Sequence, residues 1–165
     1  MAAITNTAFS RPKWRSIVIL TLAFWLSGSL ILDLLIMPSL YAAGMMTSPG
    51  FASAGYTMFW LFNHLEVLCA ALVVTGVLVL KNIPGVPTSR WSVPLAVGLL
   101  TIVLIYTYAL TPALSALGLQ LDLFNATLTL PTTMGQMHSG YWLLEAVKLI
   151  AGGTLLGIQF KSVEA

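Results

Sequence analysis

The sequence predicts an all-α integral membrane protein in which four transmembrane helices form an up-down bundle with both termini cytoplasmic. Of its 165 residues, 58% are hydrophobic and only 7% are charged, whereas a typical soluble domain has about 25% charged residues. The apolar residues also fall into four runs, each long enough to cross a hydrocarbon layer about 30 Å thick. Together these observations exclude a water-soluble enzyme and a disordered chain, and the single cysteine excludes a disulfide scaffold.

The four predicted spans are residues 16–37, 58–80, 93–110 and 139–160 of one membrane domain, 1–165. The first apolar run is longer than the roughly 7–15 residues of a signal-peptide core, so we interpret it as a retained anchor. Prolines follow three of the runs, at Pro38, at Pro84 and Pro87, and at Pro112. Because proline has no N–H to continue the hydrogen-bond ladder, we expect the helices to end there.

The two outer loops, 38–57 and 111–138, are themselves apolar. Ser48 and Pro49 are a typical pair of N-cap and first helical residue, so the second helix is expected to begin near Pro49. Thr132 or Thr133 is expected to begin the fourth helix in the same way. Residues 113–124 are predicted to form a short helix that lies on the outer surface or caps the bundle.

The orientation follows from the positive charges, which are enriched on the cytoplasmic side of membrane proteins. Six of the seven Lys and Arg residues flank the same ends of the spans, namely Arg11, Lys13, Arg15, Lys81, Arg90 and Lys161. The outer loops contain neither Lys nor Arg. Because the cations are spread thinly, nucleic acid is not an expected partner. The lipid bilayer is the expected one, and a homo-oligomer or a membrane complex is compatible with the sequence.

Ionisable residues inside a span are costly, so they indicate function. His138, Tyr141, Glu145 and Lys148 follow one another at spacings of 3, 4 and 3 in the fourth span. At about 100° per residue they form one polar stripe that descends from the outer interface toward the middle of the membrane. A pair such as Glu145 and Lys148 that only helps the helix to pack is the alternative interpretation.

Other spans add polar residues at a similar depth. Asp33 lies in the first span, and Asn63, His64 and Glu66 lie in the second. Asn63 and Glu66 share a helix face, whereas His64 points about 160° away from Glu66 and is either a structural or a functional histidine. We therefore predict an outward-facing pocket built from Asp33, Asn63, His64, Glu66, His138, Tyr141, Glu145 and Lys148.

Such a pocket could bind a metal ion or a small cofactor. The predicted metal ligands are His138, Glu145 and Glu66, with Asp33 and Lys148 as charge partners. A haem held by His138 or His64 in a membrane redox enzyme is a second hypothesis. A structural or assembly subunit, whose buried charges fix the helix register, is a third. No hydrolase, kinase or dehydrogenase motif is present, so catalysis stays open. Gly153 and Gly157 form a GxxxG pattern, which predicts close helix packing within the bundle.

Several short motifs support a resemblance to a known family. They are the run Phe24–Ser29 with Asp33 and Pro38 after it, the run Phe62–Glu66, and the stripe from His138 to Lys148. In these motifs the chain resembles the small four-span proteins of the domain of unknown function 4149 family, which are similar in layout to CopD-type and HemJ-type proteins. The resemblance implies a bacterial protein of the cell membrane, or of the thylakoid membrane if it is cyanobacterial. In the HemJ-type pattern a histidine closes the first span, where this chain has Pro38.

Overall fold

The computed structural model describes residues 12–45, 48, 50–116 and 132–164, and no strand occurs among them. The first long helix consists of α1 (Pro12–Leu30), a π-helical segment η1 (Ile31–Ile36) and α2 (Met37–Ala42). The second is α3 (Phe51–Asn82). The third consists of α4 (Ser92–Ile105), a second π-helical segment η3 (Tyr106–Leu110) and residues 111–116. The fourth is α6 (Thr132–Glu164).

The predicted all-helical fold is confirmed. Four stretches are long and apolar enough to cross a membrane: Lys13–Ala42, Phe51–Asn82, Ser92–Ala116 and Gly135–Ser162. Each of them contains one of the four apolar runs identified in the sequence. Four such helices in one chain point to a multi-pass membrane protein.

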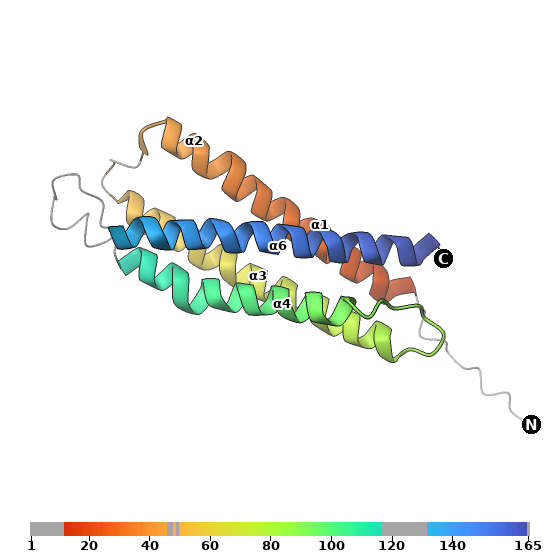
Figure 1. The fold of residues 1–165 in the computed structure, drawn as a ribbon. Coiled ribbons are helices and arrows are strands. Elements are labelled where there is room, and N and C mark those ends of the chain that lie inside the picture. The colour runs from red at the N-terminus through yellow and green to blue at the C-terminus, as the bar shows by residue number, and fades with distance from the viewer. Residues whose placement is uncertain (1–11, 46–47, 49, 117–131, 165) are drawn as a thin grey trace, which may run out of the picture.

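The four helices form an elongated bundle in which α1 contacts α3 and α6, and α4 contacts the same two helices (Figure 1). Within the described residues, α1 and α4 therefore lie diagonally opposite each other, as do α3 and α6. The start of α1, the end of α6 and the connection 83–91 lie together at one end, here called the terminal end (Figure 1). The opposite end, where α2 ends and α3 begins, is the distal end. This connectivity agrees with the up-down topology, and the cytoplasmic location of the terminal end stays a prediction.

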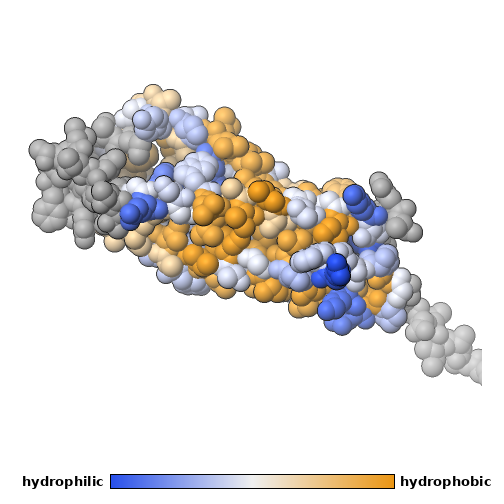
Figure 2. Space-filling model, in the orientation of Figure 1, coloured by the Kyte–Doolittle hydropathy of each residue, from blue (hydrophilic) through white to orange (hydrophobic). Residues whose placement is uncertain are grey.

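Figure 2 shows hydrophobic side chains along the middle of the visible face and hydrophilic ones toward the two ends. Large apolar residues such as Leu20, Leu68 and Ile150 are mostly exposed, as expected of side chains that face lipid. The interior is also apolar over the terminal half of the bundle, where Val18, Leu99 and Leu155 are completely buried. Most of the buried polar residues lie beyond this apolar layer, toward the distal end, whereas Ser92 and Gln159 are buried near the terminal end.

Two glycines allow the helices to approach each other closely. A Cβ atom on Gly152 would lie 2.7 Å from Leu26 Cδ2, and one on Gly76 would overlap Val18. The expectation that Gly153 and Gly157 make this close contact is wrong, because no atom of another helix lies within 4 Å of a Cβ built on either. These two glycines lie on the outer surface of α6.

The expectation that Pro38 and Pro112 end their helices is also wrong, because both helices continue through them. Each proline is the second residue after a π-helical segment. The N–H of Met37 bonds to the carbonyl of Leu32, and the N–H of Thr111 bonds to that of Tyr106, both five residues back. A proline just after such a wide turn starts a new α-helical ladder, where its missing N–H costs little.

One of the two predicted helix starts can be compared with the structure. The fourth helix, predicted to begin at Thr132 or Thr133, is helical from Thr132, the first described residue of this segment. The second begins at Phe51 instead of Pro49, and its N-cap is Gly50, which has a φ of 82°. A left-handed φ favours glycine over a residue such as Ser48. Of the predicted surface helix 113–124, residues 113–116 continue the third helix and the others lie outside the described residues.

Candidate functional site

A cluster of three charged side chains lies at the middle of the bundle. The Lys148 ammonium of α6 is 2.6 Å from Glu66 Oε1 of α3 and 2.7 Å from Glu145 Oε2 of its own helix. All three residues are 1% exposed. Glu66 is the sixteenth of 32 residues in α3, so the cluster lies about 22 Å along that helix from its first residue.

The carboxylate of Glu66 also joins α1 to the cluster. Trp25 Nε1 donates a hydrogen bond to Glu66 Oε1 at 2.8 Å, and Ser29 Oγ donates to the same oxygen at 3.0 Å. Both donors are buried. With Lys148, three donors therefore converge on a single carboxylate oxygen, an arrangement that stabilises a negative charge in an apolar interior.

Tyr106, the first residue of η3, brings the third long helix into the cluster. Its hydroxyl donates a hydrogen bond to Glu145 Oε2 at 3.2 Å and lies 3.4 Å from the carbonyl oxygen of Tyr141. Its ring lies 5.3 Å from Lys148 Nζ, a distance suited to a cation–π interaction. All four long helices thus contribute a side chain that touches Glu66, Glu145 or Lys148.

Asp33 lies in η1, on the distal side of the cluster. The Tyr141 hydroxyl donates a hydrogen bond to Asp33 Oδ1 at 2.9 Å, and the rings of Tyr141 and Tyr106 are 5.0 Å apart. Asp33 is 4% exposed, yet its second oxygen, Oδ2, has no hydrogen-bond partner. Glu145 Oε1 is likewise buried without a partner. The side chains of Asp33 and Glu145 are also close enough to interact with each other.

Both π-helical segments carry a residue of this network. Asp33 lies in η1 and Tyr106 in η3. A π-helical turn is rare and is often found at functional sites, because it widens the helix and changes the direction of the side chains that follow. The two segments place a carboxylate and a phenol opposite the polar stripe of α6.

A cavity of about 220 Å³ at the distal end is bordered by Asp33. Its other walls are mostly aromatic and apolar: Met37, Pro38, Tyr41, Phe51, Phe59, His138, Tyr141 and Trp142. Tyr141 packs edge-on against Phe59 and Trp142. The cavity is therefore lined mainly by aromatic side chains, with one carboxylate, that of Asp33, and one exposed imidazole, that of His138.

The structure separates the predicted site residues into three groups. Glu66, Glu145 and Lys148 form the central cluster, while Asp33, Tyr141 and His138 border the cavity. Asn63 is buried elsewhere and donates a hydrogen bond to Thr111 Oγ1 at 2.6 Å, which ties α3 to the third long helix. His64 lies with its Nδ1 2.7 Å from the carbonyl oxygen of Trp60 and packs against the Trp60 ring. This placement agrees with the structural interpretation of His64.

The predicted metal ligands His138, Glu145 and Glu66 do not come together. No group of three or more His, Cys, Asp or Glu side chains that could hold a metal occurs among the residues that the structure describes. Lys148 lies between the two glutamates. His138 is seven residues from Glu145 on the same helix, about 10 Å along its axis. These distances and the intervening ammonium explain why the set does not form.

Three residues of the site were not predicted from the sequence: Trp25, Ser29 and Tyr106. Tryptophan, serine and tyrosine are common in membrane helices, so none of them stands out as a buried charge does. One signal was available, because Trp25, Ser29 and Asp33 follow at intervals of four and therefore share a helix face.

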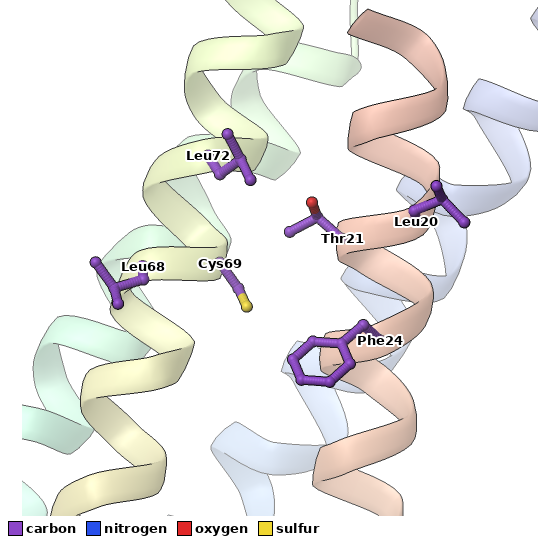
Figure 3. A pocket seen from close by; sticks show the side chains of 6 residues that line it. All are labelled: Leu20, Thr21, Phe24, Leu68, Cys69 and Leu72. Atoms are coloured by element: carbon purple, nitrogen blue, oxygen red, sulfur yellow. The ribbon is translucent and has the colours of Figure 1, made fainter. Parts of the chain in front are cut away.

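A wider groove lies between α1 and α3, with a volume of about 340 Å³. Figure 3 shows that Thr21 of α1 and Cys69 of α3 point into the space between the helices. The remaining lining residues are Leu20, Phe24, Leu68 and Leu72. This groove lacks charged groups and faces the side of the bundle, so it is a lipid-facing depression with no evident chemistry.

Comparison of the chain with protein-family models, curated proteins and solved structures gives no match.

Proposed function

We propose that this chain is a membrane protein that binds a small organic cation in the distal cavity, with Asp33 as the counter-charge. The observation that carries the proposal is Asp33, a buried carboxyl group that borders a mostly aromatic cavity and forms no ion pair with the described residues. A buried charge that is not paired is costly. A ligand that brings a positive charge to Asp33 therefore gains binding free energy that a neutral ligand does not.

The charge balance of the interior supports a cation. Asp33, Glu66 and Glu145 are three buried carboxyl groups, and Lys148 is the single ammonium that pairs with any of them among the described residues. If all four groups are ionised, two negative charges are left over. In an apolar interior this excess has to be balanced by protons or by a bound cation. Asp33 takes part in neither ion pair, so it is the group most open to such a ligand.

The aromatic walls favour an organic cation over a metal ion. Rings of Tyr41, Phe51, Phe59, Tyr141 and Trp142 border the cavity, and the faces of such rings attract alkylammonium groups. Magnesium and calcium instead require several oxygen ligands, and zinc usually takes four ligands. The cavity offers one carboxylate and one imidazole, from Asp33 and His138.

A structural role for the buried charges is a second candidate, and a specific observation favours it. Both ion pairs of Lys148 are internal: the pair with Glu66 connects α6 to α3, and the pair with Glu145 lies within α6. Such a cluster can fix the helix register without any ligand. Membership of the domain of unknown function 4149 family and the haem hypothesis stay predictions from the sequence, and no contact of His138 or His64 favours haem.

Choline and 3,3-dimethyl-1-butanol test the proposal, because they have almost the same shape and differ in charge. We expect calorimetric titration of the protein in detergent micelles to show that choline binds at least about tenfold more tightly than the neutral alcohol. In Asp33→Asn this preference should disappear. Tyr108→Phe is the control, because Tyr108 is 70% exposed and does not border the cavity.

Equal affinities for the two probes would show that the cavity does not recognise the positive charge, and would refute the proposed binding of a cation. A folded protein that binds neither probe would also refute it. If, in addition, Asp33→Asn changes only the stability of the protein, the structural candidate takes its place.

A further inference from the structure

A third cavity, of about 240 Å³, lies at the terminal end, far along the bundle from Asp33. It is formed by the last turns of α3, the connection 83–91 and the first residues of α4. Its lining residues are Val77, Lys81, Thr88, Ser89, Arg90, Ser92 and Val93. Two cations and three hydroxyl groups therefore border one hollow, with a valine from each helix on its apolar side.

The cations of this cavity are not neutralised by the described chain. Lys81 and Arg90 are exposed, and neither forms an ion pair within the part of the protein that the structure describes. Arg90 lies over the ring of Trp91, with 5.7 Å between its guanidinium carbon and the ring centroid. The long helices meeting at this end also carry Lys13, Arg15 and Lys161, and Glu164 is the one acidic residue of the sequence in the same region. The surroundings are therefore strongly positive.

A buried hydroxyl group at the start of α4 points to a ligand independently of these charges. Ser92 is the first residue of this 14-residue helix and is 2% exposed, yet its Oγ has no hydrogen-bond partner. α4 has no side-chain cap. The N–H of Ser92 already bonds to the carbonyl of Ser89 and Pro94 has no N–H, so the start of the helix contributes mainly the partial positive charge of its dipole. A buried donor without a partner beside a helix N-terminus and two cations is suited to an anion with several acceptor oxygens.

We propose that this cavity binds the phosphate group of an anionic phospholipid. Lys81 and Arg90 provide the charge, and the Ser92 hydroxyl provides a directed donor. A lipid headgroup is favoured over a free anion because the cavity lies at the end of two apolar helices and has Val77 and Val93 in its wall. Trp91, which is 58% exposed, is typical of the headgroup level of a membrane. The proposal does not depend on the distal cavity.

The test uses the full chain in detergent micelles, with phosphatidylglycerol, phosphatidylcholine and inorganic phosphate as separate additions. Native mass spectrometry measures the bound lipid, and the thermal midpoint measures its effect on stability. We expect phosphatidylglycerol to bind to the wild type and to raise the midpoint more than the other two additions do. The double variant Lys81→Ala/Arg90→Ala should lose at least about tenfold in affinity for it. Lys13→Ala/Lys161→Ala removes the same charge from the same end outside the cavity and should keep most of the affinity.

Ser92→Ala distinguishes a binding role of the hydroxyl from a merely structural one. Without lipid, removal of a buried hydroxyl that has no partner should leave the thermal midpoint unchanged or raise it. With phosphatidylglycerol, the same variant should bind about tenfold more weakly than the wild type, because the directed donor is lost. The variant, at least as stable as the wild type without lipid, would therefore be the less stable of the two when the lipid is added.

Three results would overturn the proposal. Equal losses in the two double variants would mean that the lipid responds to diffuse charge and not to this cavity. An equal effect of phosphatidylcholine would mean that no anionic group is recognised. If inorganic phosphate reproduces the effect of phosphatidylglycerol, the site takes a free anion and not a lipid.

Discussion

The Lys148 ammonium contacts the Glu66 carboxylate at 2.6 Å across the diagonal of the bundle. The helices that carry them, α6 and α3, are not packed against each other within the described residues. The long lysine side chain therefore spans the centre, and the donors Trp25 and Tyr106 approach the same cluster from the other two helices. The cluster of Lys148, Glu66 and Glu145 thus connects all four helices.

Replacing Lys148 with methionine should be strongly destabilising. Glu66 and Glu145 would be left buried without their cation, which costs about 3–5 kcal/mol when one partner of a buried pair is removed. The free energy of unfolding in mixed micelles measures this loss. The triple variant Lys148→Met/Glu66→Gln/Glu145→Gln removes both charges as well and should recover most of the loss. A triple variant as unstable as Lys148→Met would show that packing of the lysine, and not its charge, is what matters.

Trp25→Phe should separate the hydrogen bond to Glu66 from the packing of the ring. Phenylalanine keeps an aromatic side chain but loses the N–H that donates at 2.8 Å to the carboxylate. A hydrogen bond to a charged group is worth about 1.5–3 kcal/mol, so we expect a loss of that size in unfolding free energy. Trp91→Phe, at an exposed position, should change the stability by less than about 0.5 kcal/mol. Similar effects of the two substitutions would contradict the buried hydrogen bond.

Alanine substitutions of glycines should distinguish the close helix contacts from the exposed GxxxG pattern. Gly76→Ala places a methyl group against Val18, and Gly152→Ala places one against Leu26. Overpacking of this kind costs about 1–3 kcal/mol. Gly153→Ala and Gly157→Ala meet open space and should keep or slightly raise the stability of the monomer, since alanine has the better helix propensity. Thermal unfolding of the four variants in one detergent measures the difference. A larger loss of stability in Gly153→Ala and Gly157→Ala than in the other two variants would refute the close contacts assigned to Gly76 and Gly152.

The orientation in the membrane can be tested with single cysteines in a Cys69→Ala background. Thr88→Cys lies in the connection at the terminal end, and Ala43→Cys follows α2 at the distal end, both at exposed positions. If the positive charges mark the cytoplasmic side, a membrane-impermeant maleimide added to intact cells should label only Ala43→Cys. After the cells are opened, both variants should react. Labelling of Thr88→Cys alone in intact cells would mean that the protein has the opposite orientation.

The charged residues of the site were predictable, because Glu66, Glu145 and Lys148 are rare residue types within apolar runs. Which of these residues contact one another was harder to predict. Lys148 is ten residues after His138, about 15 Å along the helix. The distal part of the stripe, His138 and Tyr141, therefore borders the cavity, while Glu145 and Lys148 belong to the central cluster. Helical spacing shows which residues share a face, but not which of them meet a partner from another helix. The prediction of a three-residue metal set combined residues from these two levels.

The course of the helices beyond Pro38 could not be predicted either. Proline normally indicates the end of a helix, and nothing in residues 31–36 alone predicts the π-helical turn that precedes it. The helix start at Phe51 was misplaced for a related reason, because a good local N-cap at Ser48 competed with Gly50, whose left-handed backbone begins the helix.

The two π-helical segments have a consequence for how the chain could change its length in evolution. Inserting or deleting a residue in a regular α-helix turns every following side chain by about 100°. It would therefore turn part of the lipid-facing surface toward the interior and part of the interior surface toward lipid. A π-helical turn contains the extra residue locally and leaves the helix on both sides in phase. Loss of one residue from Ile31–Ile36 or Tyr106–Leu110 would preserve the outer surface of the bundle and alter mainly the turn that carries Asp33 or Tyr106. Related chains could thus differ in length at the site itself while keeping the same membrane-spanning bundle.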